Sequence, residues 1–275
     1  MSKLICITII TLLFGAMNLQ AQKLPNVQEA SLRAPANIKI DGRLNEWKDS
    51  LQAYNKATQL YYTVSNDDEN LYLTVKADQP RVITKLIDVG LTFIINKAGK
   101  KSSDAKDNIQ LTYPMLDFAP GQRILWYAGS RVRSETAVPK GVRDMDTTTY
   151  SSVRADSLIK IANTMLGNHA KNIAVKGIPQ IQDSLLSIYN EERIKAVGRF
   201  DKAGIYVYEL AIPLKYLNLD AGQKFSYSIH LENRMTKPKR GMHTMYIYVE
   251  RMPVDIDQDL DSTTDMWGYY TLSSK

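Results

Sequence analysis

The stretch Leu71-Tyr72-Leu73-Thr74-Val75-Lys76 decides the fold class, because its aliphatic side chains recur at every second position. Successive side chains of a β-strand point to opposite faces, so this alternation predicts a strand with one apolar face. The turn-forming run Ser65-Asn66-Asp67-Asp68-Glu69-Asn70 precedes it. A second alternating stretch covers residues 89–95 and ends at Asn96-Lys97-Ala98-Gly99. We therefore expect two neighbouring strands in this part of the chain.

The same pattern returns in the last third of the chain. Alternating or apolar stretches cover residues 205–212, 225–231, 245–249 and 268–272. Many short strands separated by turns are typical of a sandwich or barrel. We expect a mainly β protein, an immunoglobulin-like antiparallel β-sandwich that forms one domain over residues 22–275.

The middle of the chain has a different periodicity. Apolar residues recur at helical spacing in residues 156–166, and Asp156 stands where an N-cap is expected. The pattern predicts a helix within a partly helical insertion at about residues 139–193. No clean linker isolates this stretch, so it is not expected to be an independent domain.

The N-terminus has the features of a signal peptide. Lys3 is followed by an apolar or Thr run over residues 4–14 and by a polar exit that ends in a small residue, Ala21. The run is shorter than the roughly 20 apolar residues that span a membrane. We expect residues 1–21 to be removed and the protein to be exported, periplasmic or extracellular, with a retained N-terminal anchor as the alternative. No further segment predicts a membrane span.

Cysteine content and charge limit the function classes. The single cysteine, Cys6, lies in the expected leader, so the mature chain has no disulfide, thiolate nucleophile or cysteine-based zinc site. The formal net charge is +6, but the basic residues are dispersed among acidic ones. Without a basic stripe or an RNA-binding motif, nucleic-acid binding is not expected.

Four pieces of sequence carry a family resemblance. Ile38-Lys39-Ile40-Asp41-Gly42-Arg43-Leu44-Asn45-Glu46-Trp47 resembles the opening of family 9 carbohydrate-binding modules and of the related DOMON-like sandwiches. Similar pieces follow in order at Asp67-Asp68-Glu69-Asn70-Leu71-Tyr72-Leu73, Tyr208-Glu209-Leu210-Ala211-Ile212-Pro213-Leu214 and Trp267-Gly268-Tyr269. The resemblance implies an immunoglobulin-like sandwich that often carries calcium and binds sugar through aromatic side chains. Fold alone does not carry function with it.

The aromatic residues suggest where a sugar would bind. Sixteen tyrosines against five phenylalanines favour the surface, because tyrosine has a flat apolar face and a polar tip. Tyr206 and Tyr208 indicate either a sheet with both faces covered or a stacking platform. The candidate platform residues are Trp126, Tyr127 and Trp267, with His230, Glu232, Asn233 and Arg234 as polar partners. An ordinary tyrosine-rich surface is the alternative. Trp47, after the Asp41-Gly42 turn, is expected to be buried.

A run of acidic residues suggests an ion site. Alternate side chains of an extended segment point the same way, so carboxylates at every second position crowd together. Ca²⁺ prefers oxygen ligands in flexible loops. The candidate calcium ligands are Asp255, Asp257, Asp259, Asp261 and Asp265, and a solvated loop is the alternative. Asp67, Asp68 and Glu69 form a weaker second candidate.

No motif indicates catalysis. The three histidines, His169, His230 and His243, belong to no His-Glu-x-x-His motif, and there is no Gly-x-Ser-x-Gly elbow. The sequence therefore predicts a non-catalytic carbohydrate-binding domain with no catalytic residues. The alternatives are a cell-envelope scaffold that lost the sugar site and, less favoured, a glycoside hydrolase, which needs only two suitably spaced carboxylates.

Overall fold

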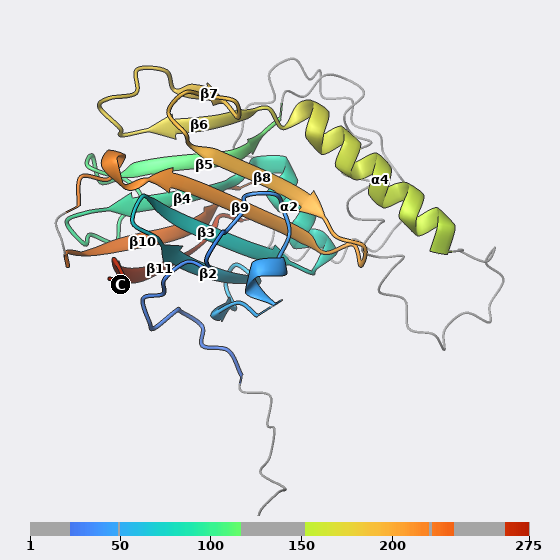
Figure 1. Ribbon diagram of the computed structural model, residues 1–275, viewed down its shortest axis with the longest axis horizontal. Helices are drawn as coiled ribbons and strands as arrows, with labels where there is room; N and C mark the ends of the chain where they lie inside the picture. Colours follow the sequence, from blue (N-terminus) through green and yellow to red (C-terminus); the bar gives the residue numbers. More distant parts are fainter. Residues whose placement is uncertain (1–22, 49, 117–151, 220–221, 234–261, 275) are drawn as a thin grey trace, which may run out of the picture.

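The computed structural model describes residues 23–48, 50–116, 152–219, 222–233 and 262–274. Two antiparallel sheets, one of five strands and one of six, stack on each other (Figure 1). The prediction of a mainly β sandwich is confirmed. No helix in these residues has the length and apolar character needed to cross a membrane.

The five-stranded sheet lies at the front of Figure 1 and has the strand order β1-β2-β3-β9-β8. Its strands are β1 (Ala53–Asn55), β2 (Leu60–Asn66), β3 (Asn70–Ala77), β8 (Lys195–Phe200) and β9 (Tyr206–Pro213). Residues 71–76 and 205–212 therefore form strands as the alternation predicts. β3 and β9 are sequentially distant but pair directly, with Thr74 opposite Glu209.

The six-stranded sheet has the order β11-β10-β4-β5-β6-β7. Its strands are β4 (Leu91–Asn96), β5 (Ile109–Met115), β6 (Asn172–Lys176), β7 (Leu185–Ser187), β10 (Lys224–Leu231) and β11 (Thr264–Thr271). β6 and β7 lie within the expected insertion, yet they extend the sheet. The strand expected at 245–249 lies outside the described residues.

Two α-helices lie among the residues that the structure describes. Helix α2 (Pro80–Val89) links β3 to β4 across the two sheets, and helix α4 (Ser152–His169) lies beside β8. The helix expected at 156–166 is confirmed, but its N-cap at Asp156 is wrong, because the helix continues upstream to Ser152 and Asp156 lies exposed within it. Two short 3-10 turns, η1 (Asn45–Trp47) and η2 (Leu214–Tyr216), complete the described elements.

Helix α2 was not predicted, since the sequence was expected to form a strand only from residue 89 and no element was assigned to residues 79–88. Its signals are visible in retrospect. Pro80 is compatible with a first helical turn, Val82, Ile83, Leu86 and Ile87 are buried at helical spacing, and Gly90 ends the helix with φ of +74°. Because Val89 ends the helix, β4 begins only at Leu91.

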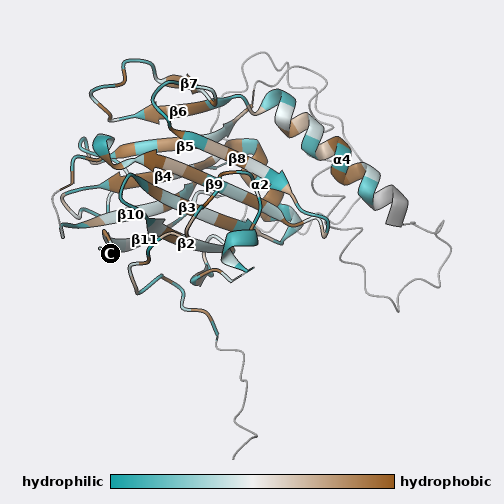
Figure 2. Cartoon of the chain, viewed as in Figure 1, coloured by the Kyte–Doolittle hydropathy of each residue, from teal (hydrophilic) through white to brown (hydrophobic). Residues whose placement is uncertain are grey.

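The apolar core lies between the sheets and contains several tyrosines. Tyr62, Tyr206, Tyr208 and Tyr227 are fully buried, so the expectation that tyrosines lie at the surface is wrong for these four. The Tyr62 and Tyr227 hydroxyl oxygens lie 3.2 Å apart, and Tyr62 also accepts a hydrogen bond from the backbone N–H of Gln28. The inward direction of Tyr206 and Tyr208 rules out a stacking platform there. Hydrophobic residues (brown in Figure 2) are concentrated on the strands.

A second apolar cluster covers the outer face of the five-stranded sheet. Leu44, Trp47 and Leu51 pack there against Val207 of β9. Gly42 starts this segment with φ of +74°, a conformation that glycine adopts without steric cost. Trp47 is 7% exposed, which confirms that it is buried. Residues 41–48 and Leu51 thus cover part of the outer face of this sheet.

The N-terminal segment also contacts the last strand. The Tyr270 hydroxyl donates to the backbone oxygen of Leu32 at 2.8 Å and lies 2.9 Å from Asn66 Oδ1. The Arg33 guanidinium donates to the backbone oxygen of Ser273 at 3.2 Å. Polar contacts between residues more than 200 positions apart therefore hold β11 against β2 and the segment before η1.

Candidate functional site

The β10–β11 pair carries most of the candidate site residues that the structure describes. β11 is an edge strand of the six-stranded sheet. Met266 and Tyr270 are buried in the core, so the alternation of side chains places Asp265, Trp267 and Tyr269 on the opposite, outer face. The register sets Asp265 opposite His230 and Trp267 opposite Ser228. The outer face of this corner therefore combines an indole ring with acidic and imidazole groups.

Trp267 has a fixed, partly exposed ring. Its indole N–H donates to Asp265 Oδ2 at 2.9 Å, a contact between residues two positions apart on one strand face. No aromatic or cation–π contact occupies this ring in the part of the chain that the structure describes. The polar edge of Trp267 is therefore engaged, while its flat face has no ring or cation partner.

The end of β10 adds a polar group beside Asp265. His230 Nε2 lies 3.5 Å from Glu232 Oε2, and the Thr263 hydroxyl donates to Glu232 Oε1 at 3.0 Å. The backbone N–H of Asn233 donates to the same oxygen at 3.1 Å. Burial acts to raise the pKa of Glu232, but these hydrogen bonds outweigh it and hold the pKa below its ordinary value. Glu232 is therefore an ionised hydrogen-bond acceptor at neutral pH.

Tyr269 lies next to Trp267 on this face and is 43% exposed. Its ring is contacted by two ammonium groups, with Lys101 Nζ 4.2 Å and Lys224 Nζ 4.6 Å from the ring centre. Cation–π contacts of this kind hold an aromatic face. Tyr269 is therefore the more exposed ring, and Trp267 is the ring without a cation contact among the described residues.

Several predicted site residues cannot be placed on this face. Trp126, Tyr127, Arg234, Asp255, Asp257, Asp259 and Asp261 lie outside the described residues. His230, Glu232, Trp267 and Asp265 are brought together, and Asn233 follows Glu232 at the end of the strand. Asp265, predicted as a calcium ligand, here accepts the indole N–H. Among the residues that the structure describes, no group of three His, Cys, Asp or Glu side chains is arranged to hold a metal ion.

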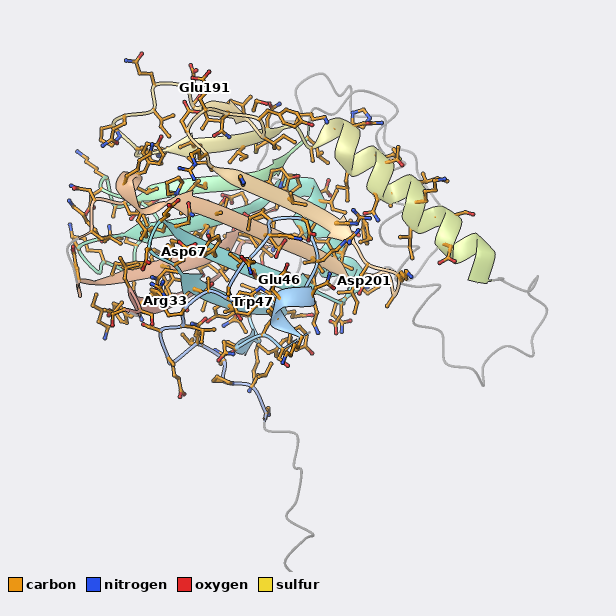
Figure 3. All side chains as sticks on the ribbon, in the orientation of Figure 1. Arg33, Glu46, Trp47, Asp67, Glu191 and Asp201 are labelled. Carbon is orange, nitrogen blue, oxygen red and sulfur yellow. The ribbon has the colours of Figure 1, made fainter. Side chains whose placement is uncertain are left out.

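The weaker acidic candidate, at residues 67–69, is engaged in internal contacts. Asp67 Oδ1 accepts hydrogen bonds from the backbone N–H groups of Glu69 and Asn70, and its Oδ2 accepts one from the Tyr72 hydroxyl. Asp68 and Glu69 pair with arginines: Arg33 at 2.9 Å and Arg193 at 3.2 Å, respectively. Figure 3 labels Arg33 and Asp67 at the same end of the sandwich. These carboxylates stabilise the turn before β3.

A second polar cluster, on the outer face of the five-stranded sheet, was not predicted. Glu209 of β9 is fully buried, and its Oε2 accepts hydrogen bonds from the backbone N–H groups of Asp41 and Gly42 at 2.9 and 2.8 Å. Asp41 and Glu46 lie close enough for their charges to act on it. The sequence signal for this cluster was Glu209 itself, an acidic residue inside an otherwise apolar and aromatic strand. A carboxyl group buried in such a strand must find hydrogen-bond donors.

Comparison with known proteins adds no identification. No protein-family model matches this chain, and no curated protein matches it either.

Proposed function

We propose that this protein is a non-catalytic, exported domain that binds carbohydrate on the outer face of β10 and β11. The observation that supports it is the partly exposed Trp267 ring, oriented by Asp265, which lies opposite His230, whose Nε2 is 3.5 Å from Glu232 Oε2. Sugar rings have apolar C–H faces that stack on an aromatic ring, and their hydroxyl groups need nearby donors and acceptors. This corner of the sheet provides both kinds of group within two strands.

The electrostatics of the site favour binding over hydrolysis. A glycoside hydrolase needs one carboxylic acid that keeps its proton near neutral pH, which requires a raised pKa. Hydrogen bonds from Asn233, Thr263 and His230 lower the pKa of Glu232 instead. Glu232 thus accepts hydrogen bonds from a ligand rather than donating a proton to a leaving group.

Export and calcium are further parts of the same proposal. Export rests on the N-terminal residues 1–21, which have the features of a leader. Calcium would bind the acidic run that begins at Asp255 and precedes β11 in the sequence. A calcium-dependent rise in the melting temperature, lost when Asp257 and Asp259 are both replaced by Asn, is the corresponding expectation.

A glycan array followed by calorimetry tests the binding proposal. We expect one glycan class to bind, and Trp267→Ala to weaken binding at least about tenfold, the equivalent of 1.4 kcal/mol. Tyr189→Ala is the matched control. Tyr189 is 76% exposed and follows β7, at the opposite edge of the same sheet, so its loss should leave binding unchanged.

Three outcomes would contradict the proposal. If no glycan on the array binds, although circular dichroism shows that the protein is folded, a cell-envelope scaffold that kept the sandwich without a sugar site is favoured. Equal loss of affinity in the Trp267 and Tyr189 variants would place the binding surface elsewhere. Hydrolysis of the bound glycan that depends on a single carboxylate would instead restore the hydrolase alternative.

A further inference from the structure

The cluster around Glu209 contains several buried polar atoms without partners. Glu209 Oε1 and Thr74 Oγ1 are buried and accept or donate no hydrogen bond, although the two residues are direct cross-strand neighbours. Both side chains are at most 1% exposed. Buried polar atoms nearly always have a hydrogen-bond partner. Two neighbouring buried atoms that lack one therefore indicate a water molecule or an ion between them.

The covering segment contributes more atoms of the same kind. Asp41 Oδ1, Glu46 Oε2 and Trp47 Nε1 are also buried without a partner. They belong to the turn and the 3-10 helix η1 that lie over β9, where Figure 3 labels Glu46 and Trp47. Five such atoms therefore face the junction between this segment and the sheet, and four of the five are oxygens.

The charge of the cluster is not balanced by a basic side chain. None of the ion pairs formed within the described residues includes Asp41, Glu46 or Glu209. Burial, together with the charges of Asp41 and Glu46, raises the pKa of Glu209 to about 7. Two hydrogen bonds from backbone N–H groups act in the opposite direction and do not offset this. The cluster thus contains three acidic side chains and, among the described residues, no basic side chain paired with them.

We propose that the junction between residues 41–47 and β9 binds one hydrated divalent cation among the unpaired oxygens of Glu209, Asp41 and Glu46, of which at most two bind the ion directly. No three acidic groups converge as a ready-made chelate in the described residues, so at most two carboxylates bind the ion directly and water fills the remaining positions. These waters satisfy Thr74 Oγ1 and Trp47 Nε1. Asp41 and Glu46 are half-buried, which gives the ion a route from solvent.

This site is separate from the acidic run at residues 255–265 and from the β10–β11 face. It lies on the other sheet, and its ligands come from the first third of the chain and from β9. Its function is to fix the segment that carries Trp47 over the five-stranded sheet. Sugar binding and occupancy of this site can therefore be measured independently.

Thermal melting with magnesium or calcium chloride after treatment with chelator tests the proposal. We expect millimolar cation to raise the melting midpoint by a few degrees. Glu209→Gln and, separately, Glu46→Gln should remove this rise. Glu232→Gln and the double replacement of Asp257 and Asp259 by Asn are the matched controls, which should keep it.

Terbium luminescence locates the ion, because a bound Tb³⁺ is excited by a nearby indole. We expect a luminescence signal that Trp47→Phe removes while Trp267→Phe retains it. An unchanged melting midpoint with every cation would overturn the proposal and leave a water cluster. A midpoint rise that survives Glu209→Gln and Glu46→Gln but not the Asp257 and Asp259 replacements would overturn it in favour of the acidic run.

Discussion

Replacing Glu209 by Gln should make the stability of the protein less dependent on pH. Burial and the neighbouring carboxylates raise the pKa of Glu209 in the folded chain from 4.5 to about 7. Between these two values the folded state holds a proton that the unfolded state has released, so stability falls as pH rises. The pKa difference corresponds to about 3 kcal/mol, fully present below pH 4.5 and lost once the pH passes 7.

Glutamine keeps the shape of the side chain and its acceptor for the N–H groups of Asp41 and Gly42. Its amide group can donate toward the unpaired oxygens of Asp41 and Glu46, as the protonated acid can. We therefore expect the variant to match the wild type near pH 5 and to be more stable by about 3 kcal/mol at pH 8.

Urea denaturation in chelator-treated buffer at several values between pH 5 and 8 is the measurement. The chelator matters because a bound cation would stabilise ionised Glu209 and reduce the difference. Glu29→Gln, at an exposed carboxyl, is the control and should leave the pH profile unchanged. A constant difference between wild type and Glu209→Gln across this range would refute the reasoning.

Two further predictions concern the turns around the five-stranded sheet. Gly42→Ala should lower the free energy of unfolding by about 2 kcal/mol or more, because φ is +74° and the added Cβ would lie 2.6 Å from Arg199 Cβ. Urea denaturation of the variant and the wild type measures this loss, and an unchanged midpoint would contradict the prediction. Asp67→Asn should cost about 1 kcal/mol at pH 7. Although burial opposes them, hydrogen bonds from Tyr72 and the backbone hold the pKa of Asp67 below 3.8, so this stabilisation is lost as the pH falls below that value. Urea denaturation should show a smaller difference in stability between wild type and Asp67→Asn at pH 3 than at pH 7. An equal difference at both pH values would contradict the role of ionised Asp67 in the turn.

The sandwich was predictable because its strands alternate clearly. Residues 71–76 lie in β3, with Leu71, Leu73 and Val75 in the core. The Asp41-Gly42 turn and the buried Trp47 were also predictable, since each depends on local conformation or side-chain size. Helix α2 was missed because its apolar residues merge with those of β4, and only Gly90 separates the two elements.

The candidate sites show where a single sequence stops being informative. Trp267, Asp265 and His230 could be proposed from residue type, but their meeting depends on the register of β10 and β11, which no local pattern encodes. Tyr206 and Tyr208 were wrongly considered for the surface, because alternation does not say which face is the interior when both are apolar. Glu209 and Asp41 are 168 residues apart, so their contact depends on the packing of the covering segment.

The contacts of Tyr270 with Leu32 and Asn66 have a consequence for the order in which the molecule can form. A ribosome delivers Leu32 long before Tyr270, so the segment preceding η1 can pair with Asn66 of β2 first and gains its contact with Tyr270 only once β11 has been made. Until then β10 presents an uncovered edge carrying Phe225 and Tyr227, which are fully buried in the finished fold. A chain built this way completes the contacts of its first described segment only after β11 has been synthesised.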